Sequence, residues 1–267
     1  MKKYILALDQ GTTSARAVVY DKSGNLSAMC SQAIKQIYPQ GGWVEHDPED
    51  IWLACVNCAR GAVEKAGIGA EDIAAIGIAN QRETVVMWDK DTGKPVYNAI
   101  VWQCRRTSGM CESIKEEGLE EYIYDRTGLK ADPYFSATKL RWILDNVPRA
   151  RKLAESGRLL AGTVDCFLLW RLTGRHCTDI TNASRTMLFD IHNKRWSEEL
   201  LRLFAIPRAV LPEVLPSGVE FGVTNLLGAP VPVCGVAGDQ QAAMLGLMCT
   251  EYGDSKCTYG TGCFMLM

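Results

Sequence analysis

YILALDQGTTSARAVVYDKSG, residues 4–24, carries the pattern from which the rest of the chain can be interpreted. Two apolar runs, at 4–8 and 15–20, predict two strands, and the Gly-Thr-Thr-Ser turn between them predicts an antiparallel hairpin. Such a turn can also expose backbone N–H groups toward one point, which suits phosphate oxygens. The alternative is a tight hairpin whose Thr and Ser only satisfy backbone groups.

Side chains around this turn add to the phosphate interpretation. Thr12, Thr13 and Ser14 supply hydroxyl donors, and Arg16 supplies a fixed positive charge. Asp9, at the end of the first predicted strand, can hold a magnesium ion beside bound phosphates, directly or through water. The pattern is not a Walker motif, because no Gly-Lys-Thr follows it.

The remainder of the chain mixes strands with helices. Asp47-Pro48 predicts a helix start with Asp47 as the cap, and Gly67 predicts its end. The apolar run at 73–79 predicts a strand covered on both faces. Other strands are predicted at 25–29, 84–88, 98–102 and 231–236, and helices at 106–117, 137–146, 149–155, 163–172 (capped by Thr163), 197–204 and 239–247. This mixture predicts an α/β domain on a mixed sheet flanked by helices.

Composition excludes several classes of function. The net charge of −2 gives no basic field for nucleic acid or an anionic membrane. No apolar run reaches the roughly 18 residues of a membrane span. The eleven cysteines are scattered through apolar segments, which is typical of reduced thiols and predicts a cytoplasmic protein.

Arg82 and Glu83 interrupt an apolar stretch. In a regular strand these neighbours would face opposite sides of the sheet, so both can serve one ligand only if the chain turns there. Arg82 donates hydrogen bonds and Glu83 accepts them, a combination that suits the hydroxyls of a small polyol. A local salt bridge on a rim is the alternative.

Asp239 lies between a predicted buried strand and a predicted helix. It is either a helix cap or a base that orients a substrate hydroxyl and accepts its proton during phosphoryl transfer, and the two roles are compatible. Trp102 and Tyr134 lie in or beside loop-like segments, where core packing is the alternative to ligand contact.

The last stretch, KCTYGTGCFMLM (256–267), repeats the opening arrangement of apolar strand, Gly-Thr turn and apolar strand. An apolar strand with nothing after it would leave an unpaired edge. We therefore expect residues 1–247 to form one domain and residues 248–267 to be the truncated start of a second, similarly built domain.

Taken in order, a series of blocks resembles the FGGY family of carbohydrate kinases, and within it the branch that phosphorylates glycerol. The blocks are ALDQGTTSARAVV, GGWVEHDPEDIW, GIANQRETVVMWD, NAIVWQCRRT, DPYFSATKLRWIL, GTVDCFLLWRLTG, TNASRTMLFDI, GVAGDQQAAMLG and KCTYGTGCFMLM. The resemblance implies an actin-like (RNase H-like) ATPase fold with two facing domains. It implies transfer of a phosphoryl group from ATP to glycerol, giving glycerol 3-phosphate and ADP, with magnesium.

The resemblance also assigns roles to residues. It implies that Asp239 is the catalytic base and that Asp9 lies near the magnesium. Glycerol would be bound by Arg82, Glu83, Tyr134, Asp239 and Gln240, with Trp102 and Phe264 as walls on its carbon side. Nucleotide phosphates would be held by Thr12, Thr13, Ser14, Arg16 and Thr261.

Two other functions remain open at this stage. One is a kinase for another small polyol or sugar of the same family. The other is a non-catalytic actin-like nucleotide-binding module, which would not need the Arg82, Glu83, Tyr134 and Asp239 set. Neither nucleic acid nor membrane is expected as a partner, and the resemblance allows for a homo-oligomer of the full-length protein.

Overall fold

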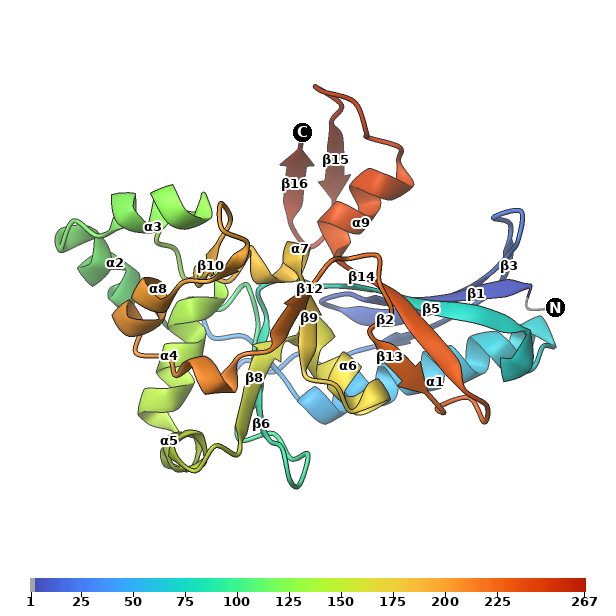
Figure 1. Cartoon of the computed structure of the whole chain (residues 1–267), viewed down its shortest axis with the longest axis horizontal. Coiled ribbons are helices and arrows are strands. Elements are labelled where there is room, and N and C mark those ends of the chain that lie inside the picture. The colour runs from blue at the N-terminus through green and yellow to red at the C-terminus, as the bar shows by residue number, and fades with distance from the viewer. Residues whose placement is uncertain (1–2) are drawn as a thin grey trace.

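A six-stranded mixed sheet forms the part of the chain that carries its amino terminus, in the order β13-β14-β5-β1-β2-β3 (Figure 1). The computed structural model describes residues 3–267. The meander predicted from the sequence is confirmed: β1 (Tyr4–Gln10), β2 (Ser14–Asp21) and β3 (Leu26–Ala33) pair antiparallel. β5 (Ile73–Asn80) runs parallel to β1.

The carboxyl ends of three parallel strands, β1, β5 and β14, lie at the same end of this sheet. β14 (Val231–Gly238) runs parallel to β5, and β13 (Gly222–Thr224) closes the edge beside it. In the register, Asn80 faces both Gln10 and Gly238. The segments that follow β1, β5 and β14 therefore begin side by side, at the edge where open α/β sheets bind their ligands.

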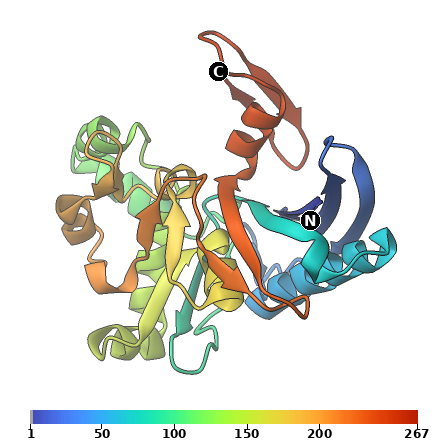
Figure 2. The ribbon, with the colours of Figure 1, turned by 45° about the vertical axis from the view of Figure 1, so that its right-hand side comes forward.

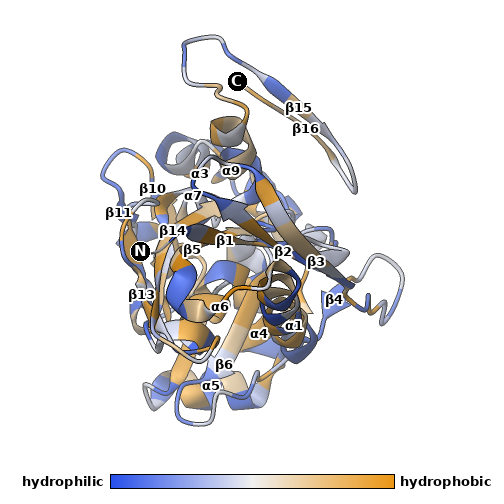
Figure 3. Ribbon diagram, turned by 90° about the vertical axis from the view of Figure 1, so that its right-hand side faces the viewer, coloured by the Kyte–Doolittle hydropathy of each residue, from blue (hydrophilic) through white to orange (hydrophobic). Residues whose placement is uncertain are grey.

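Two helices cover one face of the sheet. α1 (Pro48–Ala66) and α6 (Val164–Thr173) pack on the same side and bury a shared apolar core (Figure 3). The expectation that β5 is covered on both faces is wrong. Ile76 and Ile78 point into this core, whereas Ala75, Gly77 and Ala79 on the other face are only half-buried.

The predicted helix ends are confirmed in one case and corrected in another. Asp47 caps α1 by accepting from the N–H of Glu49, and Gly67 ends it with φ 65°. Thr163 is at the N-cap position of α6, but its side chain does not cap the helix. Its hydroxyl donates instead to the buried carboxylate of Asp165, at 2.6 Å from Oδ1.

A second core surrounds a four-stranded sheet in the order β4-β7-β6-β8. Its strands are β4 (Glu45–His46), β7 (Ala99–Ile100), β6 (Val85–Asp89) and β8 (Leu159–Thr163). The helices grouped around it on the left of Figure 1 are α2 (Ser108–Glu116), α3 (Glu120–Thr127), α4 (Ser136–Asn146), α5 (Pro148–Glu155) and α8 (Glu198–Leu203). Of these elements, α3, β4 and β8 were not predicted from the sequence.

Several short elements complete the fold. β9 (Cys177–Asp179) pairs parallel with β12 (Glu213–Leu215), and β10 (Phe189–Asp190) pairs with β11 (Arg195–Trp196). The one-turn helix α7 (Ile180–Ala183) follows β9. Two 3₁₀ turns lie at Ala70–Asp72 and Arg208–Val210. None of the helices in residues 3–267 has both the length and the apolar character needed to cross a bilayer.

The carboxyl-terminal hairpin stands apart from both larger sheets. α9 (Asp239–Gly246) leads to β15 (Lys256–Tyr259) and β16 (Cys263–Leu266), which pair only with each other among the described strands. Figure 2 shows this hairpin projecting away from the body of the chain, above the carboxyl ends of β14 and β5.

Candidate active site

A cleft of about 440 Å³ opens at the edge where β1, β5 and β14 end, below the β15–β16 hairpin. It brings together every residue to which the sequence assigned a role in binding or catalysis. They are Asp9, Thr12, Thr13, Ser14, Arg16, Arg82, Glu83, Trp102, Tyr134, Asp239, Gln240, Thr261 and Phe264.

The β1–β2 turn forms one wall of the cleft. Gly11 N–H donates to the carbonyl of Ser14 at 2.9 Å, which closes the hairpin, and a Cβ on Gly11 would lie 3.1 Å from that carbonyl. Arg16 Nη1 lies 3.7 Å from Asp9 Oδ2, with both side chains about half exposed. Burial raises the pKa of Asp9, and the charge of Arg16 opposes this. The turn is thus a hairpin whose polar groups also line the cleft.

Arg82 and Glu83 both face the cleft because the chain turns between β5 and β6, as expected for two neighbours that serve one ligand. Glu83 has φ 62°, in the left-handed region, and Thr84 N–H donates to the carbonyl of Arg82 at 2.7 Å. Such a backbone conformation costs on the order of 1 kcal/mol for a residue with a side chain, and strain of this kind is concentrated at functional sites. Both side chains are buried, so the pair is not a salt bridge on an exposed rim.

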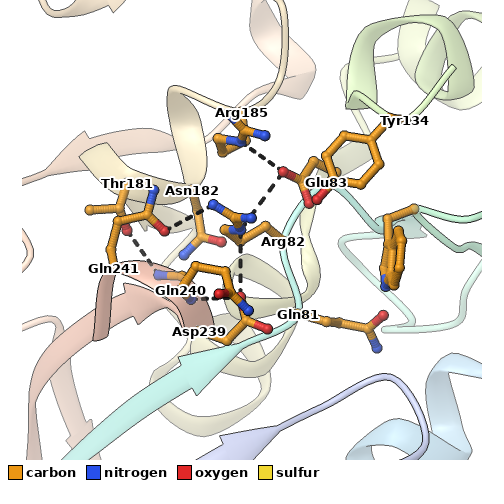
Figure 4. Close-up of polar contacts among 12 residues, drawn as sticks. Gln81, Arg82, Glu83, Tyr134, Thr181, Asn182, Arg185, Asp239, Gln240 and Gln241 are labelled. Carbon is orange, nitrogen blue, oxygen red and sulfur yellow. Dashed lines mark hydrogen bonds and ion pairs between the residues drawn. The ribbon is translucent and has the colours of Figure 1, made fainter. Parts of the chain in front are cut away.

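Asp239 and Arg82 lie next to each other in the cleft (Figure 4). Arg82 Nε lies 3.5 Å from Asp239 Oδ1 and 3.8 Å from Glu83 Oε1, and Arg82 Nη1 donates to Gln241 Oε1 at 3.2 Å. The Arg82 side chain is 4% exposed and that of Asp239 is 33% exposed. The guanidinium is therefore a buried bridge between two carboxylates, one of which is open to solvent.

The start of α9 places the Asp239 carboxylate. Asp239 is the first helical residue and Gly238 is the N-cap, so the helix-cap interpretation needs correction. Asp239 Oδ1 accepts the N–H of the next residue, Gln240, at 2.7 Å. Burial raises the pKa of Asp239, and the nearby charge of Arg82 opposes this. The same Oδ1 thus contacts both Arg82 and the helix N-terminus, while the 33% exposure leaves the carboxylate open to a ligand in the cleft.

Three aromatic rings border the polar groups. Trp102 packs edge-to-face on Tyr134 and on Phe264, with ring centroids 5.5 and 5.8 Å apart. Phe264 comes from β16, and its ring also lies 5.8 Å from the Arg82 guanidinium. The carboxyl-terminal hairpin therefore contributes an apolar wall directly beside the buried charges. Burial raises the pKa of Tyr134 to about 12, so its hydroxyl is protonated at neutral pH.

Sequence reasoning missed Arg185 and Lys139. Arg185 Nε donates to Glu83 Oε1 at 2.7 Å (Figure 4). The Arg185 guanidinium lies 4.9 Å from the Phe135 ring. Lys139 is fully buried and donates to the carbonyls of Tyr134 and Phe135, and burial lowers its pKa to about 7. Arg185 lies in the quoted block TNASRTMLFDI, but no charge pattern or spacing there indicates its contact with Glu83.

The Asp9 carboxylate and the hydroxyls of the β1–β2 turn fit a phosphate-bound magnesium ion. Within residues 3–267 there is no cluster of three or more His, Cys, Asp or Glu side chains that could bind a metal by themselves. Mg²⁺ needs no such cluster, because it usually takes one or two carboxylates together with water and substrate phosphates. Asp9 offers a carboxylate to the cleft beside the hydroxyls of the β1–β2 turn.

Comparison with known proteins identifies the family to which the chain belongs. Residues 4–246 match the model of the N-terminal domain of the FGGY family of carbohydrate kinases. The chain is 57% identical to glycerol kinase 2 of Thermotoga maritima over 269 residues, and 59% identical to glycerol kinase of Roseobacter denitrificans over 268 residues. Each alignment covers 99% of this chain and 54% of the relative, so the chain spans about half the length of the curated relatives it matches.

Solved structures give the same result for the fold. Glycerol kinase of Plasmodium falciparum, solved with ADP, superposes with a TM-score of 0.93 at 35% identity, over 98% of this chain and 53% of that one. A xylulose kinase of Lactobacillus acidophilus superposes with a TM-score of 0.86 at 24% identity, over 98% of this chain and 54% of that one. The second likeness concerns the fold alone.

Proposed function

The chain belongs to the FGGY family of carbohydrate kinases, and we propose that it forms the polyol- and phosphate-binding part of a kinase that transfers a phosphoryl group from ATP to glycerol. The observation that carries the proposal is the convergence of Arg82, Glu83, Tyr134 and Asp239 on one cleft with the β1–β2 turn. The fold is the actin-like ATPase fold of this family, with a mixed sheet flanked by helices.

Glycerol recognition follows from the donors and acceptors in the cleft. Arg82 donates, and Glu83 and Asp239 accept, so adjacent hydroxyls of a small polyol can each find a partner. Tyr134 and Gln240 add groups that can both donate and accept. Trp102 and Phe264, which pack against each other, would form the wall against the carbon chain, and the cleft of about 440 Å³ has room for a short polyol.

Asp239 is proposed as the base. It would orient one hydroxyl of the polyol and take its proton as the new oxygen–phosphorus bond forms. Burial raises its pKa above that of an ordinary carboxyl, and the charge of Arg82 favours the ionised form. Both properties suit a group that must be charged before the reaction and protonated after it.

The nucleotide phosphates would lie over the β1–β2 turn. The backbone N–H groups and hydroxyls of Thr12, Thr13 and Ser14 would bind them together with Arg16, and Thr261 would approach from the β15–β16 turn. Asp9 would hold magnesium near these phosphates. When bound, magnesium neutralises the charge that develops on the phosphate oxygens.

The domain division stays a proposal. We infer that residues 1–247 form one domain and that residues 248–267 begin a second actin-like domain, since β15 and β16 pair with neither larger sheet. Residues 1 and 2 lie outside the described part. Because positioning and exclusion of water supply most of the catalysis in phosphoryl transfer, these 267 residues alone are expected to be nearly inactive.

The cellular location is also proposed. All eleven cysteines carry free thiols, as in proteins of a reducing compartment. We therefore place the protein in the cytoplasm. Cell fractionation tests this: recovery with secreted proteins would contradict it.

The proposed function is tested by the release of ADP from Mg·ATP with glycerol, erythritol or D-xylulose as acceptor, using the full-length protein. We expect ADP formation to depend on the acceptor, with kcat/KM for glycerol at least tenfold above the other two. A preference for erythritol or xylulose would favour another kinase of the family. Nucleotide binding without any acceptor-dependent turnover would favour a non-catalytic module.

A further inference from the structure

Trp102 contacts both halves of the cleft. Its ring packs against Tyr134 and Phe264 on the side proposed for the polyol. Its indole Nε1 donates a hydrogen bond to Thr12 Oγ1 at 2.8 Å, on the side proposed for phosphates. One side chain thus joins the apolar wall to the β1–β2 turn.

The backbone around Trp102 is tied to the same turn by a second route. Trp102 N–H donates to Thr84 Oγ1 at 3.1 Å, and the Thr84 hydroxyl donates to Gln81 Oε1 at 2.9 Å. Gln81 Nε2 in turn donates to the carbonyl of Gly11 at 3.3 Å. Thr84 and Gln81 are buried, so the ring is held at a fixed distance from the turn.

The hydrogen bond to Thr12 constrains where the hydroxyl proton points. A threonine hydroxyl has one proton to donate and two acceptor positions, whereas an indole N–H can only donate. Once Trp102 occupies an acceptor position of Thr12 Oγ1, the proton of Thr12 must go elsewhere. Within residues 3–267 no protein group accepts it, and Thr12 lines the cleft. The proton is therefore free to be donated to a ligand.

We propose that Trp102 is a positioning residue for phosphate binding. Its indole N–H holds the Thr12 hydroxyl with the proton directed into the cleft, where a phosphate oxygen accepts it. This role is additional to the apolar wall and rests on the proposed function. The same ring that contacts the polyol thereby orders a donor for the nucleotide.

Replacing Trp102 by Phe separates the two roles, because Phe keeps an aromatic wall and removes the N–H. The experiment is a double-mutant cycle made of Trp102→Phe, Thr12→Val and the double variant. Trp102→Phe in a Thr12→Ser background is the rescue. All variants are made in the full-length protein. Calorimetric titration with Mg·ADP, without any polyol, measures phosphate binding. Steady-state assays give the KM for glycerol.

We expect Trp102→Phe to weaken Mg·ADP binding, measured without polyol, about fivefold, which corresponds to the loss of one hydrogen bond. In the Thr12→Val background, Trp102→Phe should cause no further loss. In the Thr12→Ser background, which retains a hydroxyl, the loss should return. A purely structural role would instead lower the melting temperature and weaken both ligands in every background.

Two results would overturn the proposal: an equal loss of Mg·ADP binding from Trp102→Phe with and without the Thr12 hydroxyl, or an effect on glycerol alone. Absence of Mg·ADP binding to the unmodified protein would also overturn it. If the protein binds Mg·ADP but does not phosphorylate glycerol, the proposed function fails while the cycle still gives its answer, because it uses no polyol.

Discussion

Arg82 Nε lies 3.5 Å from Asp239 Oδ1, although the two residues follow different strands far apart in the chain. The contact results from sheet order. β5 and β14 are parallel neighbours, and Asn80 at the end of one faces Gly238 at the end of the other. A polyol site built on these two residues therefore depends on a single register between adjacent strands.

Arg82→Lys should weaken glycerol binding at least tenfold. Lysine keeps the positive charge but loses the planar fork that reaches Glu83, Asp239 and Gln241 at once, and hydrogen bonds to charged groups contribute about 1.5–3 kcal/mol. Calorimetric titration with glycerol measures this. Arg105→Lys, in an exposed pair with Asp132, is the matched control and should bind normally. Wild-type affinity in Arg82→Lys would contradict the proposed site.

Gly238→Ala should weaken glycerol binding by a similar factor without unfolding the protein. A Cβ at Gly238 would lie 2.6 Å from Arg82 Cδ, in the middle of the side chain, so the guanidinium must move. Gly235→Ala, on the same strand, meets nothing within 4 Å and serves as the control. Equal glycerol affinities for the two variants would show that the position of Arg82 does not matter.

Arg185→Gln should move the acid limit of glycerol binding to higher pH. Burial raises the pKa of Glu83, and the charges of Arg82 and Arg185 oppose this. Without Arg185 the pKa rises further, so the carboxylate that accepts hydrogen bonds is lost earlier as pH falls. Titrations with glycerol between about pH 5 and pH 8 compare the variant with wild type. Parallel pH profiles would mean that Arg185 does not act through Glu83.

Asp165→Asn should reduce the dependence of stability on pH. Burial and the nearby charge of Asp179 raise the pKa of Asp165 to about 7 from an ordinary 3.8. The folded protein therefore holds a proton that the unfolded chain releases, and its free energy of unfolding falls as pH rises between these values. The slope is at most about 1.4 kcal/mol per pH unit. Urea unfolding checks this, with the exposed Glu116→Gln as control. An unchanged slope in Asp165→Asn would assign the pH dependence to other groups.

Local patterns predicted much of the fold. The apolar runs and the turn in residues 4–24, with the strand at 25–29, predicted the meander. Asp47 and Gly67 predicted both ends of α1, because caps and turns depend on neighbouring residues. α3 was missed because only Ile123 and Thr127 are buried in it, which leaves almost no apolar periodicity. The strand predicted at 98–102 is only Ala99–Ile100, because the chain leaves the sheet there and carries Trp102 to the cleft.

The candidate site depended on more than local patterns. The turn at Arg82-Glu83 could be anticipated, because two adjacent polar residues cannot share a ligand from a regular strand. The meeting of Arg82 with Asp239 is set by the β5–β14 register, which no short stretch encodes, and only the family resemblance suggested it. Arg185 was missed for the same reason, because its partner Glu83 is distant in sequence.

The most direct test of the central claim compares Asp239→Asn with the unmodified full-length protein in two measurements on the same samples: glycerol binding by calorimetry and acceptor-dependent ADP release from Mg·ATP. Asparagine preserves the shape of the side chain but cannot take a proton. If Asp239 is the base, kcat falls at least a hundredfold, within the usual contribution of general base catalysis, while glycerol affinity changes less than about tenfold. A variant that retains near wild-type turnover would contradict the account.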